Sequence, residues 1–190
     1  MNELLAIHRA ELERARTETN LVGPGPLDEH YLDAEAGLSD LSPSGRWADL
    51  GSGAGFPGIV LAALHPELAV DLIEPRRLRA SFLSGVLLAA GSPSRIQVVQ
   101  RRVQSVREHY DGATARALAP PAEVLALAAP ILRPGATLVL FLQEDQPVSV
   151  DRRYRLIGEV RYAVPHRAPR RTLRLERLGP APGGRDEPSR

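Results

Sequence analysis

A glycine-rich loop that follows an aspartate is the strongest chemical signal in the sequence. Residues 49–58 read Asp-Leu-Gly-Ser-Gly-Ala-Gly-Phe-Pro-Gly, and such glycines let the backbone turn sharply beside a ligand. The run from Gly53 to Gly58 also matches G-x-G-x-x-G, the dinucleotide fingerprint. A pyrophosphate, however, needs free amides at the helix N-terminus, where Pro57 removes one, and Asp49 would repel it. The cationic cofactor S-adenosylmethionine (SAM) suits Asp49 better, although the loop alone leaves both cofactors open.

An acidic residue ends the next strand pattern after the loop. Glu74 stands 25 residues after Asp49, at the end of an apolar strand pattern. A carboxylate in this place can accept hydrogen bonds from both hydroxyls of a ribose, a geometry common to NAD- and SAM-binding folds. The loop and the acid together therefore predict a cofactor that contains adenosine.

The elements that must position these residues alternate between strands and helices from residue 46 onward. We expect strands at 47–50, 69–74, 95–100, 113–117 and 136–142, and helices at 57–64, 76–90 and 121–132. Such alternation predicts right-handed βαβ units in a doubly wound parallel sheet, whose ligands bind beyond the carboxyl ends of the strands. Two β-rich runs, 154–164 and 172–178, have no helix pattern between them and predict an antiparallel hairpin.

Two residue types are missing, and their absence excludes several enzyme classes. The chain of 190 residues contains no cysteine, and all 24 basic residues are arginines. Without cysteine there is no thiolate zinc site, iron–sulfur cluster or cysteine nucleophile. Without lysine there is no Schiff base and no P-loop lysine. The histidines show no metal-ligand spacing, so we expect no metal site.

Charge is distributed unevenly along the chain. Residues 1–150 hold 13 Arg against 18 Asp and Glu, whereas residues 151–190 hold 11 Arg against 5. A basic region can attract a phosphate backbone, and a solvated arginine-rich face is the alternative interpretation. The arginines that could face RNA are Arg152, Arg153, Arg155, Arg167, Arg170 and Arg171.

Several segments, in order, resemble one known family. They are residues 47–58, Asn20-Leu21, His30-Tyr31-Leu32-Asp33, His65-Pro66-Glu67-Leu68 and Ala115-Arg116-Ala117-Leu118-Ala119. They resemble the glycine loop, the N-terminal segments, the turn before the second strand and the Ala-Arg-Ala strand of the RsmG (glucose-inhibited division protein B) rRNA methyltransferases. The resemblance covers most of residues 19–142. It implies a class I, Rossmann-like SAM-dependent methyltransferase fold, with a mostly parallel seven-stranded sheet, a C-terminal antiparallel hairpin and a short N-terminal helical segment.

The resemblance also implies an activity and a set of site residues. It implies methyl transfer from SAM to N7 of a guanine in 16S rRNA, with 16S rRNA or the small ribosomal subunit as partner. The resemblance, taken together with the glycine loop and Glu74, gives the residues that we expect to bind SAM. They are Asp49, Gly51, Ser52, Gly53, Gly55, Phe56, Glu74, Val103, Gln104 and Arg116. The expected catalytic residues are Arg116 and His30. We expect that replacing Arg116 with alanine removes methyl transfer but leaves the fold intact. For His30, a structural role is the alternative.

This chemistry agrees with the missing residue types. Guanine N7 carries an exposed lone pair and loses no proton on methylation, so neither a covalent nucleophile nor a strong base is required. Departures from the family pattern at Val22, Ala34, Leu78, Gln104 and Gln143-Glu144 keep a second hypothesis open, a SAM-binding RNA-associated protein with weak or no catalysis. An NAD-dependent oxidoreductase is a third, although it would need a second substrate domain.

We expect three regions in the chain. Residues 1–45 form an N-terminal helical segment with helices at 3–18 and 28–36, residues 46–178 the SAM-dependent methyltransferase domain, and residues 179–190 a flexible tail. Apolar runs fall far short of the ~20 residues that span a bilayer, and no basic segment precedes an apolar stretch at the N-terminus. We therefore expect a monomeric cytoplasmic protein without a membrane partner.

Overall fold

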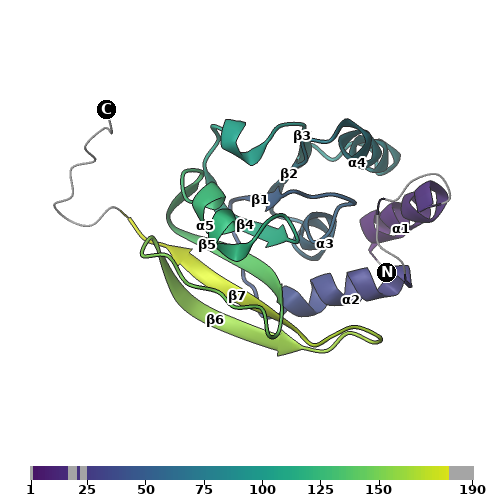
Figure 1. The fold of residues 1–190 in the computed structure, drawn as a ribbon. Helices are drawn as coiled ribbons and strands as arrows, with labels where there is room; N and C mark the ends of the chain where they lie inside the picture. Colours follow the sequence, from purple (N-terminus) through teal and green to yellow (C-terminus); the bar gives the residue numbers. More distant parts are fainter. Residues whose placement is uncertain (1, 17–20, 22–24, 180–190) are drawn as a thin grey trace.

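The computed structural model describes residues 2–16, 21 and 25–179. Its helices are α1 (Glu3–Arg16), α2 (Leu27–Gly37), α3 (Gly58–Leu64), α4 (Arg77–Ala89) and α5 (Pro121–Ala128), with a short 3-10 helix, η1 (Val103–Ser105). Its strands are β1 (Arg46–Leu50), β2 (Ala69–Ile73), β3 (Ile96–Val99), β4 (Tyr110–Arg116), β5 (Leu132–Gln143), β6 (Tyr154–Tyr162) and β7 (Arg170–Arg177). The strands form one seven-stranded sheet in the order β3-β2-β1-β4-β5-β7-β6, with helices on both faces (Figure 1).

The sheet is parallel from β3 to β5 and antiparallel at its C-terminal end. β1 pairs with β2 on one side and with β4 on the other, so the strand order reverses beside β1. A reversal of this kind opens a crevice outside the carboxyl ends of the strands. β7 runs antiparallel between β5 and β6. The predicted fold class and the C-terminal hairpin are confirmed, and the glycine loop follows β1 at the point of reversal.

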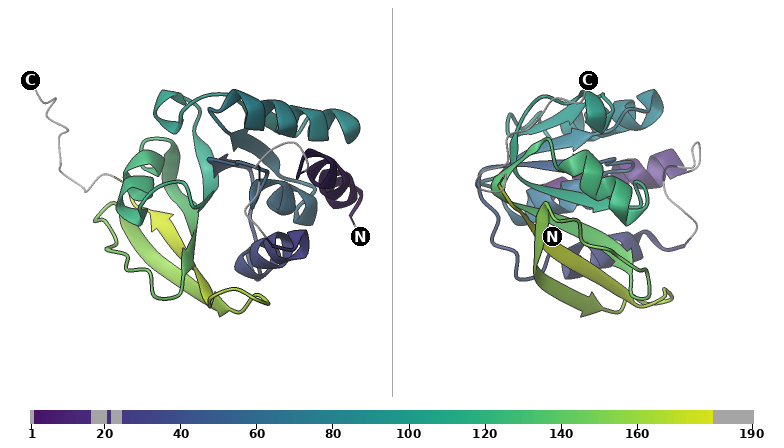
Figure 2. Two further views of the ribbon diagram at one scale, coloured as in Figure 1. Left: turned by 45° about the vertical axis from the view of Figure 1, so that its right-hand side comes forward. Right: turned by 60° about the vertical axis from the view of Figure 1, so that its left-hand side comes forward.

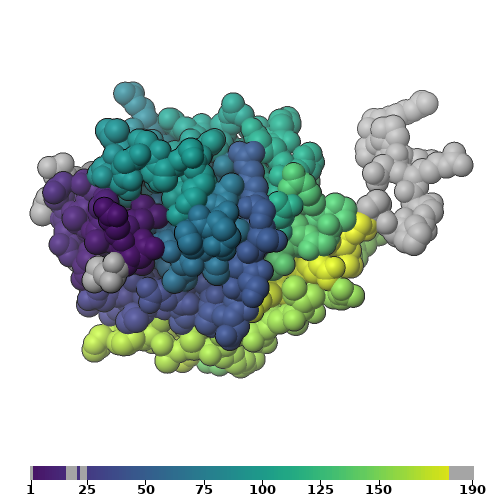
Figure 3. Space-filling view, turned by 180° about the vertical axis from the view of Figure 1, so that it is seen from behind, coloured from purple at the N-terminus to yellow at the C-terminus, as the bar shows by residue number. Residues whose placement is uncertain are grey.

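Different helices cover the two faces of the sheet (Figure 2). Because side chains alternate along a strand, Trp47 of β1 packs into the core beneath α1 to α4, whereas Ala48 and Leu50 pack into the core beneath α5 and η1. Trp47 is 2% exposed and belongs to the core. In the space-filling view, α2 (blue) lies between α1 (purple) and the β6–β7 hairpin (yellow-green) (Figure 3).

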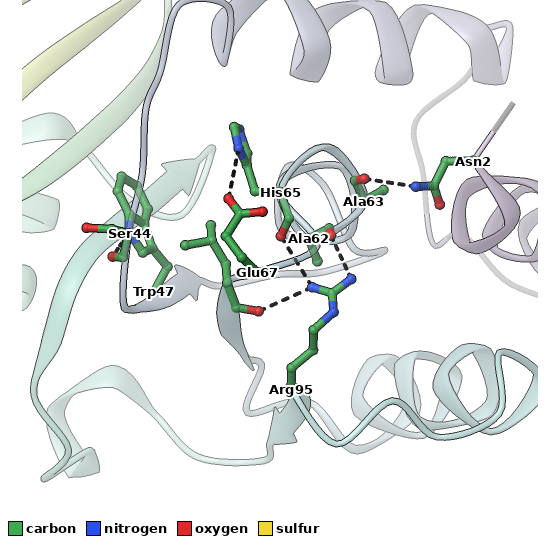
Figure 4. Close-up of polar contacts among 9 residues, drawn as sticks. Asn2, Ser44, Trp47, Ala62, Ala63, His65, Glu67 and Arg95 are labelled. Atoms are coloured by element: carbon green, nitrogen blue, oxygen red, sulfur yellow. Dashed lines mark hydrogen bonds and ion pairs between the residues drawn. The ribbon is translucent and has the colours of Figure 1, made fainter.

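Arginine and asparagine side chains fix the C-terminal end of α3, the helix that follows the glycine loop (Figure 4). The Arg95 guanidinium donates hydrogen bonds to the carbonyl oxygens of Ala62 (2.8 Å) and Leu68 (3.2 Å). Asn2 Nδ2 donates to the carbonyl oxygen of Ala63 (2.8 Å). The last carbonyls of a helix have no partner within it and favour positive charge, so these contacts hold α3 in place.

The element boundaries differ from the predictions mainly around α5. The predicted helix 121–132 ends at Ala128, and β5 begins at Leu132 instead of residue 136. The backbone N–H of Tyr110 donates to the carbonyl oxygen of Ile131 (2.9 Å), and Pro134 follows shortly after. Pairing with β4 and the proline therefore end the helix, which the apolar run alone does not reveal. Residues 17–18 of the predicted first helix and 180–190 of the predicted tail lie outside the described residues.

Candidate active site

The glycine loop between β1 and α3 is tied to the end of β2. The backbone N–H groups of Gly51 and Ser52 donate to the carbonyl oxygen of Ile73 at 2.9 and 3.0 Å. Gly51, Gly53 and Gly55 have φ values of +73°, +57° and +100°, a region that side-chain-bearing residues rarely adopt. The loop is therefore held in one shape at the carboxyl ends of two neighbouring strands.

Asp49 is buried beneath this loop. Its Oδ1 accepts a hydrogen bond from Thr114 Oγ1 (2.8 Å), and its Oδ2 accepts one from the backbone N–H of Gly58 (3.1 Å). The residue is 1% exposed, and burial raises the pKa of its carboxyl group. The carboxylate joins β1, β4 and the start of α3. Its expected attraction for a cationic cofactor stays a prediction.

Glu74 lies directly after β2 and faces the loop. Its Oε2 accepts from the backbone N–H of Gly53 (3.0 Å), and its Oε1 accepts from the backbone N–H of Arg76 (2.8 Å). Each carboxylate oxygen has two acceptor positions, so one on each oxygen is left. The remaining pair fits the two hydroxyls of a ribose. Val103 and Gln104, in η1 after β3, follow the strand next to β2.

Arg116 lies at the carboxyl end of β4, in contact with two other elements. Its Nη1 donates to Asp33 Oδ2 in α2 (2.9 Å), and its guanidinium lies over the Phe56 ring, 5.0 Å from the centroid. Tyr162 Oη donates to the other oxygen of Asp33 (2.9 Å). Because Asp33 is only 3% exposed, Arg116 is the partner of a buried charge as well as a residue of the crevice.

Phe56 packs against the two N-terminal helices. Its ring centroid lies 5.1 Å from that of His8, 4.8 Å from that of Tyr31 and 5.3 Å from that of His30. The resemblance implies that Phe56 lines the SAM site, which stays a prediction. In the structure this ring joins α1, α2 and Arg116 to the glycine loop.

His8 supports the glycine loop, a role that the sequence alone did not indicate. Its Nε2 donates to the carbonyl oxygen of Ala54 (2.7 Å), and its Nδ1 accepts from Tyr31 Oη (2.9 Å), because a carbonyl can only accept. The side chain is fully buried, and burial lowers the pKa of His8 to about 4. No local motif marks it, since Ala54 is 46 residues away in the sequence.

Acidification is expected to destabilise the protein through His8. The native imidazole has its pKa lowered to about 4, while an unfolded histidine titrates near pH 6.5. Between these values the unfolded chain binds the extra proton, so stability falls as pH drops. One such group contributes about 2 kcal/mol between pH 7 and pH 5. Denaturant unfolding at both pH values should show a smaller loss for His8→Gln than for the wild type.

The exposed His109 provides the control for this prediction. His109→Gln should keep the wild-type dependence of the unfolding free energy on pH. An equal loss of stability in His8→Gln and the wild type would show that His8 is not held neutral in the folded state.

His30 lies beside Phe56, and its Nε2 accepts from Arg167 Nη2 (3.1 Å). Burial, with the positive charges of Arg116 and Arg167, lowers the pKa of His30 to about 4. At neutral pH the imidazole is therefore uncharged. It can position a substrate but supplies no positive charge, and its catalytic role stays a prediction.

Two cavities open beyond the carboxyl ends of β4 and β5. The smaller one, of about 140 Å³, is lined by Asp33, Arg116, Leu118 and Phe141 among others. The larger one, of about 620 Å³, is lined by Glu29, His30, His166 and Arg167 among others. Gln143 and Arg170 line both, so the two cavities adjoin. Both lie at the carboxyl edge of the sheet, and of the expected SAM-binding residues Arg116 alone lines either of these two cavities.

The arginines predicted to face RNA divide into two groups. Arg153, Arg155, Arg167 and Arg171 form ion pairs with Asp151, Glu176, Glu29 and Glu159. Arg152 and Arg170 form no ion pair within the described ranges. Arg170 is the member of this second group that lines the cavities.

The described part of the chain contains no group of three or more His, Asp or Glu side chains arranged to hold a metal ion. Within the same residues, no helix has both the length and the apolar character that a membrane span requires.

The fold is that of the class I methyltransferases. Three solved structures share the fold: MtNAS in complex with MTA and tNA (TM-score 0.62, 15% identity, 90% of this chain and 71% of that chain), TrmN from Thermus thermophilus (0.57, 19%, 83% and 55%) and the putative methylase HI0767 from Haemophilus influenzae (0.55, 17%, 70% and 87%). At these identities the likeness concerns the fold alone.

The chain belongs to the GidB family, described as rRNA small subunit methyltransferase G, which matches residues 1–173. Relatives named ribosomal RNA small subunit methyltransferase G include proteins from Methylobacterium nodulans (39% identical, covering 72% of this chain and 68% of the relative) and Methylobacterium sp. strain 4-46 (40%, 72% and 68%). The protein of this name from Rhodopseudomonas palustris strain TIE-1 is 35% identical over 70% of this chain and 64% of its own length. The resemblance stated from the sequence is confirmed.

Proposed function

We propose that this protein transfers a methyl group from SAM to N7 of a guanine in 16S rRNA. The observation that carries the proposal is that a fixed glycine loop, Glu74 and Arg116 lie at the carboxyl ends of three neighbouring strands, β1, β2 and β4, in a chain that belongs to the GidB family. The position of the crevice at the strand reversal supports the same proposal.

The residues that would hold SAM come from four consecutive strand ends. Glu74 offers its free acceptor positions to the ribose, and the loop glycines leave room for the cofactor beside the backbone. We assign SAM binding to Asp49, Gly51, Ser52, Gly53, Gly55, Phe56, Glu74, Val103, Gln104 and Arg116. When bound, SAM supplies a methyl group activated by the sulfonium sulfur.

The protein's contribution to the reaction is mainly positioning. Guanine N7 needs no deprotonation, so the neutral His30 and the permanently charged Arg116 are compatible with the chemistry. Holding two reactants in line can contribute roughly 7–11 kcal/mol to lowering the barrier. Arg116, fixed by Asp33 and Phe56, would hold a phosphate group of the RNA at the rim of the smaller cavity, which adjoins the larger one.

The proposal extends to partners and organisation. We propose 16S rRNA or the small ribosomal subunit as the substrate, and a monomeric protein acting in the cytoplasm. In this proposal residues 46–178 bind SAM, and residues 1–45 support the loop through His8, which contacts Ala54, and Tyr31, which contacts Phe56.

Incubation with labelled SAM and unmodified small-subunit RNA or particles is expected to transfer label to one guanine, and mapping should identify it as N7-methylguanosine. Binding of SAM without incorporation into either substrate would favour the RNA-associated protein without catalysis. Calorimetry that shows binding of NADH and none of SAM would overturn the proposal.

A further inference from the structure

Two buried polar atoms of α2 at the larger cavity have no partner. Glu29 Oε1 and His30 Nδ1 are buried without a hydrogen bond in the structure, and both residues line the cavity. Glu29 is 6% exposed and His30 8%. Because buried polar atoms are nearly always hydrogen-bonded, this pair of neighbouring residues points to a ligand that supplies the missing partners.

The hydrogen-bonding character of the two atoms follows from Arg167. This guanidinium donates from Nε to Glu29 Oε2 (2.7 Å) and from Nη2 to His30 Nε2 (3.1 Å). His30 Nε2 must therefore accept, so the neutral ring carries its hydrogen on Nδ1. The cavity thus has a free carboxylate acceptor and a free N–H donor, both held by one arginine.

Arg170 adds a second donor to the same cavity. It lines both cavities, forms no ion pair among the described residues, and its buried Nε has no hydrogen-bond partner. With no carboxylate to hold it, the side chain can rotate to admit a ligand. Glu29 Oε1 is itself buried, so a ligand reaches it only after side chains around the cavity move.

Guanine is the nucleobase that matches these groups. Its Watson–Crick edge presents two adjacent donors, N1–H and the N2 amino group, followed by the O6 acceptor. Adenine presents an acceptor at N1 and a donor at N6, which is the reverse of what Glu29 and Arg170 require. Enzymes that modify a base take it out of the stack and read this edge in a pocket.

We propose that the larger cavity is the guanine pocket, in which Glu29 accepts from N1–H and the N2 amino group and Arg170 donates to O6. This proposal rests on the proposed function and deepens it by naming the residues that select the base. Glu29 Oε2 keeps a second acceptor position beside its bond to Arg167, so the carboxylate can accept both donors. Reading the Watson–Crick edge leaves N7 free for methylation.

The test compares guanosine with inosine, which lacks only the N2 amino group. After the modified guanine has been mapped, small-subunit RNA is prepared with a single inosine at that position. We expect the wild type to methylate the guanosine RNA about 10-fold more efficiently, as the loss of a hydrogen bond to a buried charged group predicts. Glu29→Gln should lose about 10-fold more on guanosine RNA than on inosine RNA, because only guanosine has the N2 amino group, and this brings the ratio close to 1.

Glu35→Gln serves as the matched control, because Glu35 is an exposed residue of the same helix. It should keep the wild-type ratio, and all three proteins should bind SAM equally by calorimetry. Equal efficiencies of the wild type on both RNAs would overturn the guanine pocket whether or not the variant folds, as would an unchanged ratio in Glu29→Gln. Failure of the wild type to methylate any guanine would instead overturn the proposed function.

Discussion

Replacing Arg116 with alanine is expected to reduce methyl transfer by about 1000-fold, the upper range for loss of a group that positions or stabilises the reacting centre. The same change should lower the free energy of unfolding by about 3–5 kcal/mol, because it leaves a buried carboxylate without its partner. The carboxylate is that of Asp33, which is 3% exposed. The structure therefore changes the prediction from the sequence alone, that the variant spares the fold.

Two further variants separate the catalytic effect from the structural one. Asp33→Asn combined with Arg116→Ala removes the unpaired charge, while Tyr162 Oη can still donate to the side-chain oxygen at position 33. Stability measured by denaturant unfolding should recover in part, and the rate should not. Arg133→Ala removes an exposed ion pair with Asp111 and should change stability by less than about 1 kcal/mol. A wild-type rate in Arg116→Ala would show that the residue only holds Asp33.

The parts of the fold that could be predicted from the sequence depend on local patterns. Apolar periodicity located most strands and helices, since it follows from the geometry of each element. The start of β5 at Leu132 was missed, because it depends on pairing with Tyr110 across the sheet. Composition and spacing alone do not reveal which strand an apolar segment will join.

The residues of the candidate site likewise include some that a local pattern reveals and others that depend on contacts distant in the sequence. The loop and Glu74 could be found because glycines and an acid at fixed spacing form a short motif. The contact of His8 with Ala54 spans 46 residues, and that of Arg167 with Glu29 spans 138, so no sequence window contains either. For Asp49, the charge could be read from the sequence, whereas its burial between Thr114 and Gly58 could not.

Glu74→Gln is expected to weaken SAM binding by about 100-fold. Two hydrogen bonds from hydroxyls to a charged carboxylate contribute about 3 kcal/mol together, and each 1.4 kcal/mol corresponds to a factor of ten. The glutamine amide also replaces one of the oxygens that accept from the N–H groups of Gly53 and Arg76. One of these two donors then loses its partner, which adds to the loss of affinity. Calorimetric titration with SAM and with its demethylated product measures both effects on the dissociation constant.

The control for this variant is Glu67→Gln, an exposed glutamate in the turn before β2 whose carboxylate lies 3.6 Å from His65 Nδ1. It should bind SAM with wild-type affinity. Glu74→Gln should lower the free energy of unfolding by only about 1 kcal/mol, because a single hydrogen bond within the protein is lost. If the variant bound SAM as tightly as the wild type, Glu74 would be a support of the loop alone. The ribose would then have to be held by other residues at the strand ends, with Gln104 in η1 as the next candidate to test.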